Sequence, residues 1–421
     1  MTSVETKENV SSASIEKELK NIWHHAAQLD NLRTLKTQAH IKAILANIVI
    51  VTSPASTITK ETLDDVINDL CVAHPSRFFI INYQPDLTNS LMVSVSSRCM
   101  TARSGSHICS EEIYFNVNAK GAEAIPNLFL SLLVPEVPVQ IISLVDFSRA
   151  EITNLQDSGG LSICELVMRL ASFAERVCYD SSLFEDYLIG LKFISQRLAN
   201  FGSGNISWPC NVISGNARDL TWQRVRRWRY LIAELFDSSL CLDPKRGVEE
   251  ISFIVNNNIE DVISPKVSPE VYLLLGWIMD KLEWKLTDKQ LLLTEKEVLG
   301  SFYDIDGRPV KLCINKAQKI NSSLNDQLRI SGITMIVRGE VGHRYAMEVR
   351  REIDEGYCEI ETKSISGKQE QDFCEYSVRR IAFPRQSLTE IVLAEVTAGA
   401  RSRNFGPAYR MALLLAERLK F

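Results

Sequence analysis

The sequence predicts an α/β protein with an N-terminal mixed α/β domain, a helical connection and a C-terminal α+β domain. Two observations lead to this class. In residues 15–157, short β-branched runs alternate with segments of helical periodicity, whereas several strand-like runs follow one another after residue 243. The chain has 421 residues, 45% of them hydrophobic, so it is long enough to bury more than one core.

The N-terminal domain is expected over residues 15–157, after a disordered tail at residues 1–14. The tail is polar and has no periodicity, but from Ile15 the apolar residues recur at helical spacing and predict a helix. The elements predicted next are a strand at 40–51, a helix at 59–73, a strand at 77–83, a hairpin at 91–102 and 111–118, a helix at 125–133 and a strand at 137–144.

The helical connection is expected over residues 158–243, with helical segments at 164–178 and 182–200 and a third helix from Asp219. The C-terminal domain is expected over residues 244–421. Its predicted elements are a strand at 250–257, a helix at 268–282, strands at 310–315, 333–338, 346–352 and 358–363, and a last helix at 409–419. In this last helix, an apolar stripe is expected to be buried: Met411, Leu414, Leu415 and Leu419.

Charge and hydropathy exclude two classes of partner. The chain has 47 Lys and Arg against 52 Asp and Glu, a net charge of −5, so nucleic acid is not expected as a partner. The N-terminus lacks the apolar core of a signal peptide, and no run of about 18 uncharged apolar residues occurs. We therefore expect a cytoplasmic protein with no membrane contact.

The sequence contains no pattern typical of a metal, cofactor or catalytic site. The ten cysteines include no CxxC pair, so no metal site is predicted and most are expected to be buried, reduced thiols. No P-loop, GxGxxG turn opening a helix, GxSxG or HExxH is present. We expect no catalytic residues, no cofactor and no enzyme activity.

The stretch DLTWQRVRRWRYLIAELFD, residues 219–237, places charged residues on an apolar helix face. Arg226 and Arg227 lie opposite the apolar arc and should be solvated, whereas Arg224 and Arg229 fall within or beside it. Each of the latter two needs a carboxylate, carbonyls, a stacked aromatic ring or a bound anion. We expect Arg229 to be largely buried and bonded to a carboxylate or carbonyls, and Asp219 to be the helix N-cap.

Two proline-containing segments are expected to fix the boundary between a helix and the strand that follows it. In CVAHPSRFF, Pro75 ends a helix after His74, and Arg77 begins a strand. In LLVPEVPVQIISL, Pro135 and Pro138 flank the entry into a central strand. Both segments are interpreted as architectural.

Four segments together resemble the OpcA family, the glucose-6-phosphate dehydrogenase assembly proteins of bacteria: HPSR, LLVPEVPV, DLTWQRVRRWR and LLGWIMDKLEW. Glu136 stands where the family usually has aspartate. The matching residues have a structural or partner-binding role by this resemblance: His74, Arg77, Pro135, Pro138, Asp219, Trp222, Arg224, Trp228, Arg229, Gly276 and Trp277.

The resemblance implies a non-catalytic protein that promotes assembly or allosteric activation of glucose-6-phosphate dehydrogenase, the NADP-linked first enzyme of the oxidative pentose phosphate pathway in carbohydrate metabolism. An alternative is a sugar-phosphate or nucleotide-binding α/β enzyme in which Arg77, Arg224 or Arg229 holds an anion. The residues themselves leave both hypotheses open.

Overall fold

A computed structural model of the protein divides the chain into two compact units. The first consists of Met1–Leu220 and Ser387–Arg401, and the second of Thr221–Gln386 and Ser402–Phe421. The residues that the structure describes are 11–32, 40–54, 56, 58–101, 107–147, 160–198, 217–237, 243–255, 267–286, 292–293, 297–316, 330–339, 343–352, 356–365, 377–398 and 403–418.

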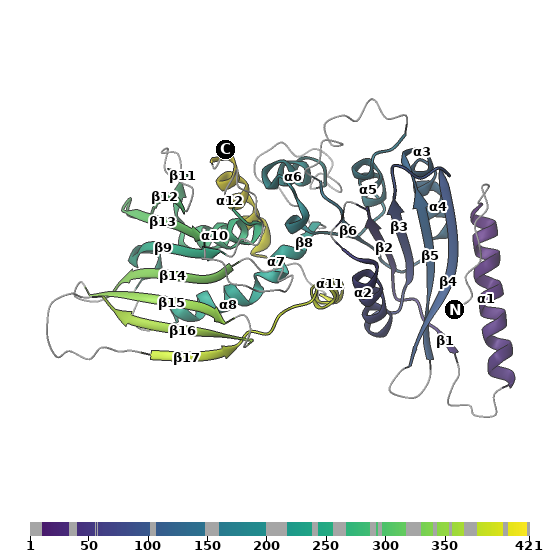
Figure 1. Ribbon diagram of the computed structural model, residues 1–421, viewed down its shortest axis with the longest axis horizontal. Coiled ribbons are helices and arrows are strands. Elements are labelled where there is room, and N and C mark those ends of the chain that lie inside the picture. The colour runs from purple at the N-terminus through teal and green to yellow at the C-terminus, as the bar shows by residue number, and fades with distance from the viewer. Residues whose placement is uncertain are drawn as a thin grey trace. The chain divides into compact units, whose positions relative to one another are not determined.

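The first unit is built on an eight-stranded sheet (Figure 1). The strand order is β1-β5-β3-β2-β6-β7-β8, with neighbours parallel along this path, and β4 pairs antiparallel with β5. Because β2 lies between β3 and β6, the chain winds outward from β2 in both directions, as in doubly wound folds. The strands are β1 (His40–Lys42), β2 (Asn47–Thr52), β3 (Arg77–Tyr83), β4 (Leu91–Thr101), β5 (His107–Val117), β6 (Val139–Leu144), β7 (Arg176–Tyr179) and β8 (Ala217–Asp219).

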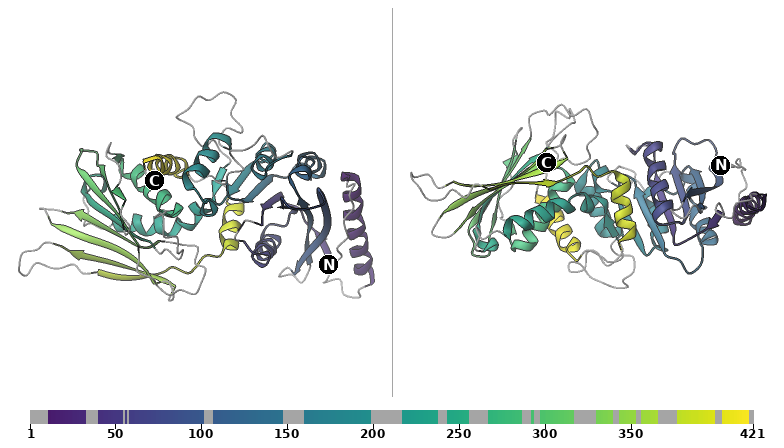
Figure 2. Two further views of the ribbon diagram at one scale, coloured as in Figure 1. Left: turned by 45° about the horizontal axis from the view of Figure 1, so that its top comes forward. Right: turned by 90° about the horizontal axis from the view of Figure 1, so that it is seen from below.

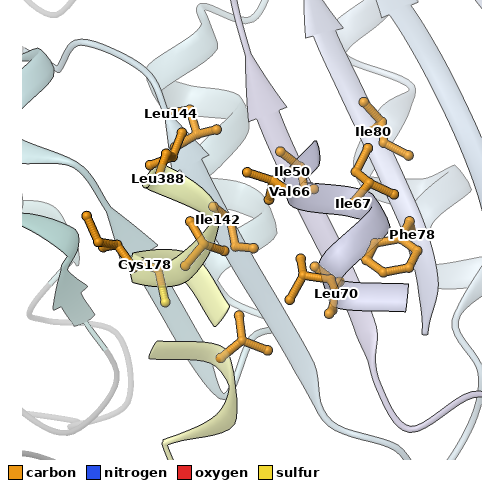
Figure 3. Close-up of a cluster of buried hydrophobic side chains, with 14 of the residues drawn as sticks. Ile50, Val66, Ile67, Leu70, Phe78, Ile80, Ile142, Leu144, Cys178 and Leu388 are labelled. Atoms are coloured by element: carbon orange, nitrogen blue, oxygen red, sulfur yellow. The ribbon is translucent and has the colours of Figure 1, made fainter. Parts of the chain in front are cut away.

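Helices cover this sheet, and one of them comes from late in the sequence. They are α1 (Ser12–Leu32), α2 (Lys60–Ala73), α3 (Ala119–Ala122), α4 (Ile125–Leu132), α5 (Ile163–Ala171), the short η3 (Ser181–Leu183), α6 (Tyr187–Phe193), η4 (Ile194–Leu198) and α11 (Leu388–Thr397). Figure 3 shows side chains of α2 and α11 in one buried cluster with Ile50 of β2 and Ile142 of β6. The α11 helix starts with a capping box between Ser387 and Glu390.

Arg176 fixes the other end of α11. Its Nη1 donates to the carbonyls of Glu395 at 2.7 Å and Val396 at 3.1 Å, and its Nη2 donates to the carbonyl of Ala398 at 2.8 Å. A cation at these unsatisfied carbonyls also interacts favourably with the helix dipole. The buried side chain of Glu395 forms a second link, an ion pair of 3.1 Å with Arg218 of β8.

Most of the predicted elements of the N-terminal part are confirmed. The strands β3 and β6, the helices α2 and α4 and the β4–β5 hairpin lie where they were expected, although α1 begins at Ser12, three residues before Ile15. The single strand expected at 40–51 is two strands, β1 and β2, which pair with different neighbours in the sheet. The tail at residues 1–10 lies outside the described residues. The helical segment expected at 164–178 is wrong in its second half, because β7 adds to the parallel sheet there with Val177 and Cys178 buried.

The second unit contains a nine-stranded sheet in the order β10-β12-β13-β9-β14-β15-β16-β17, with β11 paired to β12. Only the β13–β9 pair among these is parallel. The strands are β9 (Val248–Val255), β10 (Lys285–Leu286), β11 (Leu292–Leu293), β12 (Glu297–Tyr303), β13 (Pro309–Lys316), β14 (Ile330–Arg338), β15 (Arg344–Glu352), β16 (Tyr357–Ser364) and β17 (Ser377–Ala382).

The helices of the second unit include α8 and α10, which Figure 2 shows beside this sheet. The chain enters the unit through α7 (Leu220–Arg224) and continues in α8 (Arg226–Phe236), α9 (Pro244–Gly247), α10 (Pro269–Leu282) and α12 (Phe405–Arg418). The expected strands and both expected helices of the C-terminal part are confirmed, whereas β12 and β17 were not foreseen. No described helix has the length and apolar character needed to cross a membrane.

The units divide the chain differently from the expected boundaries. Residues 158–243 do not form a separate helical connection among the described residues, since β7 and β8 complete the first sheet and α8 belongs to the second unit. Residues 387–401, expected in the C-terminal domain, belong to the first unit. Strand pairing between distant segments decides both differences.

The buried face of α12 also differs from the expected stripe. Leu415 is buried, but Leu414 is 45% exposed and Met411 is half-buried, while Leu419 lies outside the described residues. The buried face instead combines the large residues Phe405, Tyr409, Leu413 and Leu415 with alanines that approach α10 closely. A Cβ atom added at Gly276 of α10 would lie 2.4 Å from the carbonyl oxygen of Ala408 and 2.8 Å from the backbone nitrogen of Ala412, so only glycine permits this approach.

We predict that Gly276→Ala destabilises the second unit, although alanine favours a helix by about 1 kcal/mol over glycine. The added methyl group would push α12 away, and overpacking of this kind costs about 1–3 kcal/mol. Urea unfolding measures the effect. Leu414→Ala, on the exposed side of α12, is the control and should change the unfolding free energy by less than about 0.5 kcal/mol; an equal effect of both variants would contradict the packing account.

The cysteines correct one expectation. Cys99 and Cys109, directly opposite each other in the β4–β5 ladder, form a disulfide. Their separation of ten residues resembles no known motif, and only the register of the hairpin brings the two sulfur atoms together. The remaining described cysteines are free, and four of them are buried as expected: Cys71, Cys164, Cys178 and Cys358. Burial raises the pKa of Cys71 to about 11.

Because this disulfide closes a short loop, we predict that a reductant lowers the unfolding free energy of the first unit by roughly 2–3 kcal/mol. The measurement is thermal unfolding with and without dithiothreitol. The double variant Cys99→Ser/Cys109→Ser should unfold at the same temperature in both conditions, and a wild-type transition that does not respond to the reductant would refute the prediction.

Candidate functional site

Arg77 of the HPSR segment lies at the start of β3 and is buried. Its Nε donates to Oε2 of Glu111 on β5 at 2.7 Å, and its Nη1 donates to Oε1 of Glu16 on α1 at 2.8 Å. Nη1 also donates to the carbonyl of Leu132 at the end of α4. One guanidinium therefore joins a strand pair to two helices.

Glu111 is completely buried and gathers further partners. Trp23 Nε1 donates to its Oε1 at 2.6 Å, and the ammonium group of Lys42 contacts the same oxygen. Burial alone would raise the pKa of Glu111, but the charge of Arg77 and the bonds from Lys42 and Trp23 outweigh it and hold the pKa below its ordinary value. This carboxylate stays ionised as the centre of a structural network.

His74 and Pro75 form the stiff turn expected between α2 and β3. His74 is the C-cap of α2, and its backbone N–H donates to the carbonyl of Leu70 at 2.7 Å. The hydroxyl of Ser76 donates to the carbonyl of His74 at 2.8 Å. Burial lowers the pKa of His74, so the ring is neutral near pH 7.

Asn47, the first residue of β2, holds the proline-containing loop beside this turn. Its Nδ2 donates to the carbonyl of Val134, and its Oδ1 accepts the N–H of Val134, both at 3.0 Å. Its backbone N–H donates to the carbonyl of Pro138 at 2.8 Å. Between these anchors, Pro135 and Glu136 are exposed, and Glu136 has a φ of 65°.

The stretch from Asp219 forms two helices rather than one. Val225 separates α7 from α8 with φ −83° and ψ 6°. Asp219 ends β8 directly before α7, and its Oδ1 accepts the backbone N–H of Ser181 at 3.2 Å. Trp222 and Trp228 are buried and pack on Phe405 and Phe383, with ring centroids 5.6 and 5.4 Å apart.

The arginines of this stretch have the following environments. Arg224 is buried, and its Nη1 donates to Thr221 Oγ1 at 3.3 Å. Arg229 is partly buried, and its guanidinium lies 3.3 Å from the centroid of the Trp222 ring. A stacked aromatic ring can shield a cation that remains accessible to water on its other side. Arg226 is exposed as expected, but Arg227 is half-buried.

The structure thus separates the motif residues into three groups. His74, Arg77, Pro135 and Pro138 lie at the amino ends of β2, β3 and β6, where hydrogen bonds link their segments. Asp219 ends β8, and Trp222, Arg224, Trp228 and Arg229 follow it on α7 and α8. Gly276 and Trp277 lie on α10, where Gly276 is buried and Trp277 half-buried. No group of three or more potential metal ligands occurs among the described side chains.

Sequence reasoning missed Glu111, Glu16 and Asn47, the partners that hold the first group together. A polar residue at the edge of an apolar run, such as Asn47 before IVIV, is a weak signal of a buried polar anchor. Glu111 and Glu16 are 34 and 61 residues away from Arg77 in the sequence, so no local pattern could identify them.

We predict that Arg77→Met destabilises the first unit by about 3–5 kcal/mol, because it leaves the buried Glu111 carboxylate without its main partner. In the wild type, the lowered pKa of Glu111 contributes stability that is present above the unfolded value of about 4.3 and is lost as the pH falls through the folded value. The variant should lose this pH dependence. Arg226→Met, at an exposed arginine, is the control for urea unfolding between pH 3 and pH 7.

Comparison with solved structures gives similar chains of low identity. A 3-ketoreductase from Actinomadura kijaniata is 8% identical, with a TM-score of 0.45 over 88% of this chain and 95% of that one. A levoglucosan dehydrogenase is 10% identical, with a TM-score of 0.43 over 89% and 96%. A UDP-N-acetylglucosamine 3-dehydrogenase from Acidithiobacillus ferrooxidans is 8% identical, with a TM-score of 0.42 over 90% and 96%. No curated protein matches the chain.

A family model identifies the second half of the chain. Residues 216–409 match the model that describes the C-terminal domain of a glucose-6-phosphate dehydrogenase subunit. This range includes α7 and α8 with Trp222 and Trp228, and α10 with Gly276. The resemblance drawn from the four sequence segments is confirmed by this domain, which is similar to the C-terminal domain of the OpcA proteins.

Proposed function

We propose that this protein is a non-catalytic assembly factor or allosteric activator of glucose-6-phosphate dehydrogenase in the cytoplasm of a bacterium. The observation that carries the proposal is the match of residues 216–409 to a domain described as part of a glucose-6-phosphate dehydrogenase subunit. The proposed place of action is the oxidative pentose phosphate pathway, in which that dehydrogenase acts.

The contacts of the arginines favour this proposal over the sugar-phosphate or nucleotide-binding enzyme. That alternative needs Arg77, Arg224 or Arg229 to hold an anion. Arg77 is occupied by two carboxylates and a carbonyl, and Arg229 stacks on Trp222. Arg224 is buried beside Thr221. Each side chain already has a structural role inside its own unit.

An activator must bind the active form of its target more tightly than the inactive form. Equal affinity for both forms would shift nothing. Coupling free energies of about 1–3 kcal/mol are typical and correspond to an affinity ratio of about 5–150. An assembly factor meets the same requirement when the preferred form is the complete oligomer.

We predict that the purified protein raises the activity of its cognate dehydrogenase and shifts that enzyme toward a larger oligomer. Initial rates at varied glucose 6-phosphate and NADP would be measured together with light scattering, with and without the protein. The protein alone, given both substrates, should produce no NADPH. Unchanged rates and an unchanged oligomer would reject the proposal, and turnover by the protein alone would support the enzyme alternative.

A further inference from the structure

Exposed apolar and acidic residues gather at the amino ends of β2 and β6 and in the turn after α5. We call the set of Leu45, Leu130, Pro135, Glu136, Phe173 and Glu175 the amino-edge patch. All six are exposed, with Leu45 and Leu130 each 52% accessible. Isolated exposed apolar residues are ordinary, whereas a group of them rimmed by charge is typical of an interaction site.

Backbone hydrogen bonds hold the segments of the patch together. Asn47, two residues after Leu45, donates its N–H to the carbonyl of Pro138. The N–H of Glu175 donates to the carbonyl of Val139 at 2.9 Å. The ring of Phe173 lies 6.3 Å from that of Phe129, the residue before Leu130. The patch residues therefore come from four segments of the sequence that these contacts hold next to one another.

The loop that carries Glu136 is rigid and strained. A left-handed conformation is unfavourable for a side chain such as glutamate, and Glu136 adopts it with a φ of 65° in an exposed turn. The two bonds between Asn47 and Val134 and the flanking prolines keep the turn in this form. A preformed loop loses little entropy on binding, which favours recognition of a partner.

The charges of the patch indicate the chemistry of its partner. Glu136 and Glu175 are exposed, and neither forms an ion pair in the described part of the chain. Two carboxylates beside Leu130, Phe173 and Pro135 match a surface with arginine or lysine side chains around an apolar centre. The same patch of a second copy fits poorly, because it contains no lysine or arginine to pair with these carboxylates.

We infer that the amino-edge patch is the contact surface for glucose-6-phosphate dehydrogenase and that it receives an apolar, arginine- or lysine-bearing face of that enzyme. This inference rests on the proposed function, since the partner is the same. It assigns the HPSR and LLVPEVPV segments a purpose: Arg77 and Asn47 hold the framework, and the loop around Glu136 makes the contact.

The test uses full-length protein and its cognate dehydrogenase in a binding titration by biolayer interferometry. Phe173→Ser and the double variant Glu136→Lys/Glu175→Lys should each weaken binding at least tenfold, and the wild-type affinity should fall as the salt concentration rises. Thermal melting confirms that the variants are folded. The controls are Asp86→Lys, an exposed charge that follows β3 at its opposite, carboxyl end, and Tyr230→Ser, an exposed aromatic residue on α8; both should bind as the wild type does.

The outcomes separate the two proposals. If the wild type binds the dehydrogenase and folded patch variants bind equally well, the amino-edge patch is not the contact surface and the proposed function stands. If the wild type does not bind, the proposed function fails first. If patch variants instead abolish self-association of this chain in light scattering, the occupant is a second copy and the inference is overturned.

Discussion

The buried ion pair between Arg77 and Glu111 is the interaction on which the first unit depends. Charges removed from water are tolerated only when partners surround them. Here the partners are Glu16 and Trp23 from α1, Lys42 from β1 and the carbonyl of Leu132 from α4. The pair therefore requires α1, α4 and β1 to pack correctly against the sheet. If one of these elements were misplaced, Arg77 or Glu111 would lose a partner for its charge.

This constraint changes how the motif residues are understood. Arg77, Trp228 and Gly276 belong to the motif segments, and each is buried and contacts residues of its own unit. Their chemistry positions other residues. The side chains that can meet a partner, such as Glu136 and Phe173, lie on the loops and turns that this framework holds, in keeping with the general division between scaffold and loop.

The path of the chain imposes a second constraint. The strands β7 and β8 complete the first sheet, and α11 returns from residue 388 to cover it, fastened by Arg176 and Arg218. The core of the first unit thus includes Leu388 and Ile391, more than 160 residues after Leu220. Contacts of such long sequence separation form late and slowly in folding, so the first unit cannot complete its core before most of the second unit has been synthesised.

The sequence by itself determined the local features. Periodicity identified β3, α2, α10 and the β4–β5 hairpin, because the spacing of the apolar residues in a helix or a half-buried strand indicates the type of element and its buried face. The motif segments gave the resemblance to the OpcA family, because such motifs are short stretches that can be read without the fold.

Only the tertiary structure decided which distant residues meet. Strand register and helix packing decide four features: the partner of Arg77, the pairing of Cys99 with Cys109, the position of α11 on the first sheet, and the stacking of Arg229 on Trp222. Arg176–Tyr179 is a strand because β6 offers a parallel edge, although its local pattern continued a helix. The physical reason is common to these cases. The free energy that stabilises each structure comes from contacts between distant segments, and the sequence of one segment does not specify which other segment it will contact.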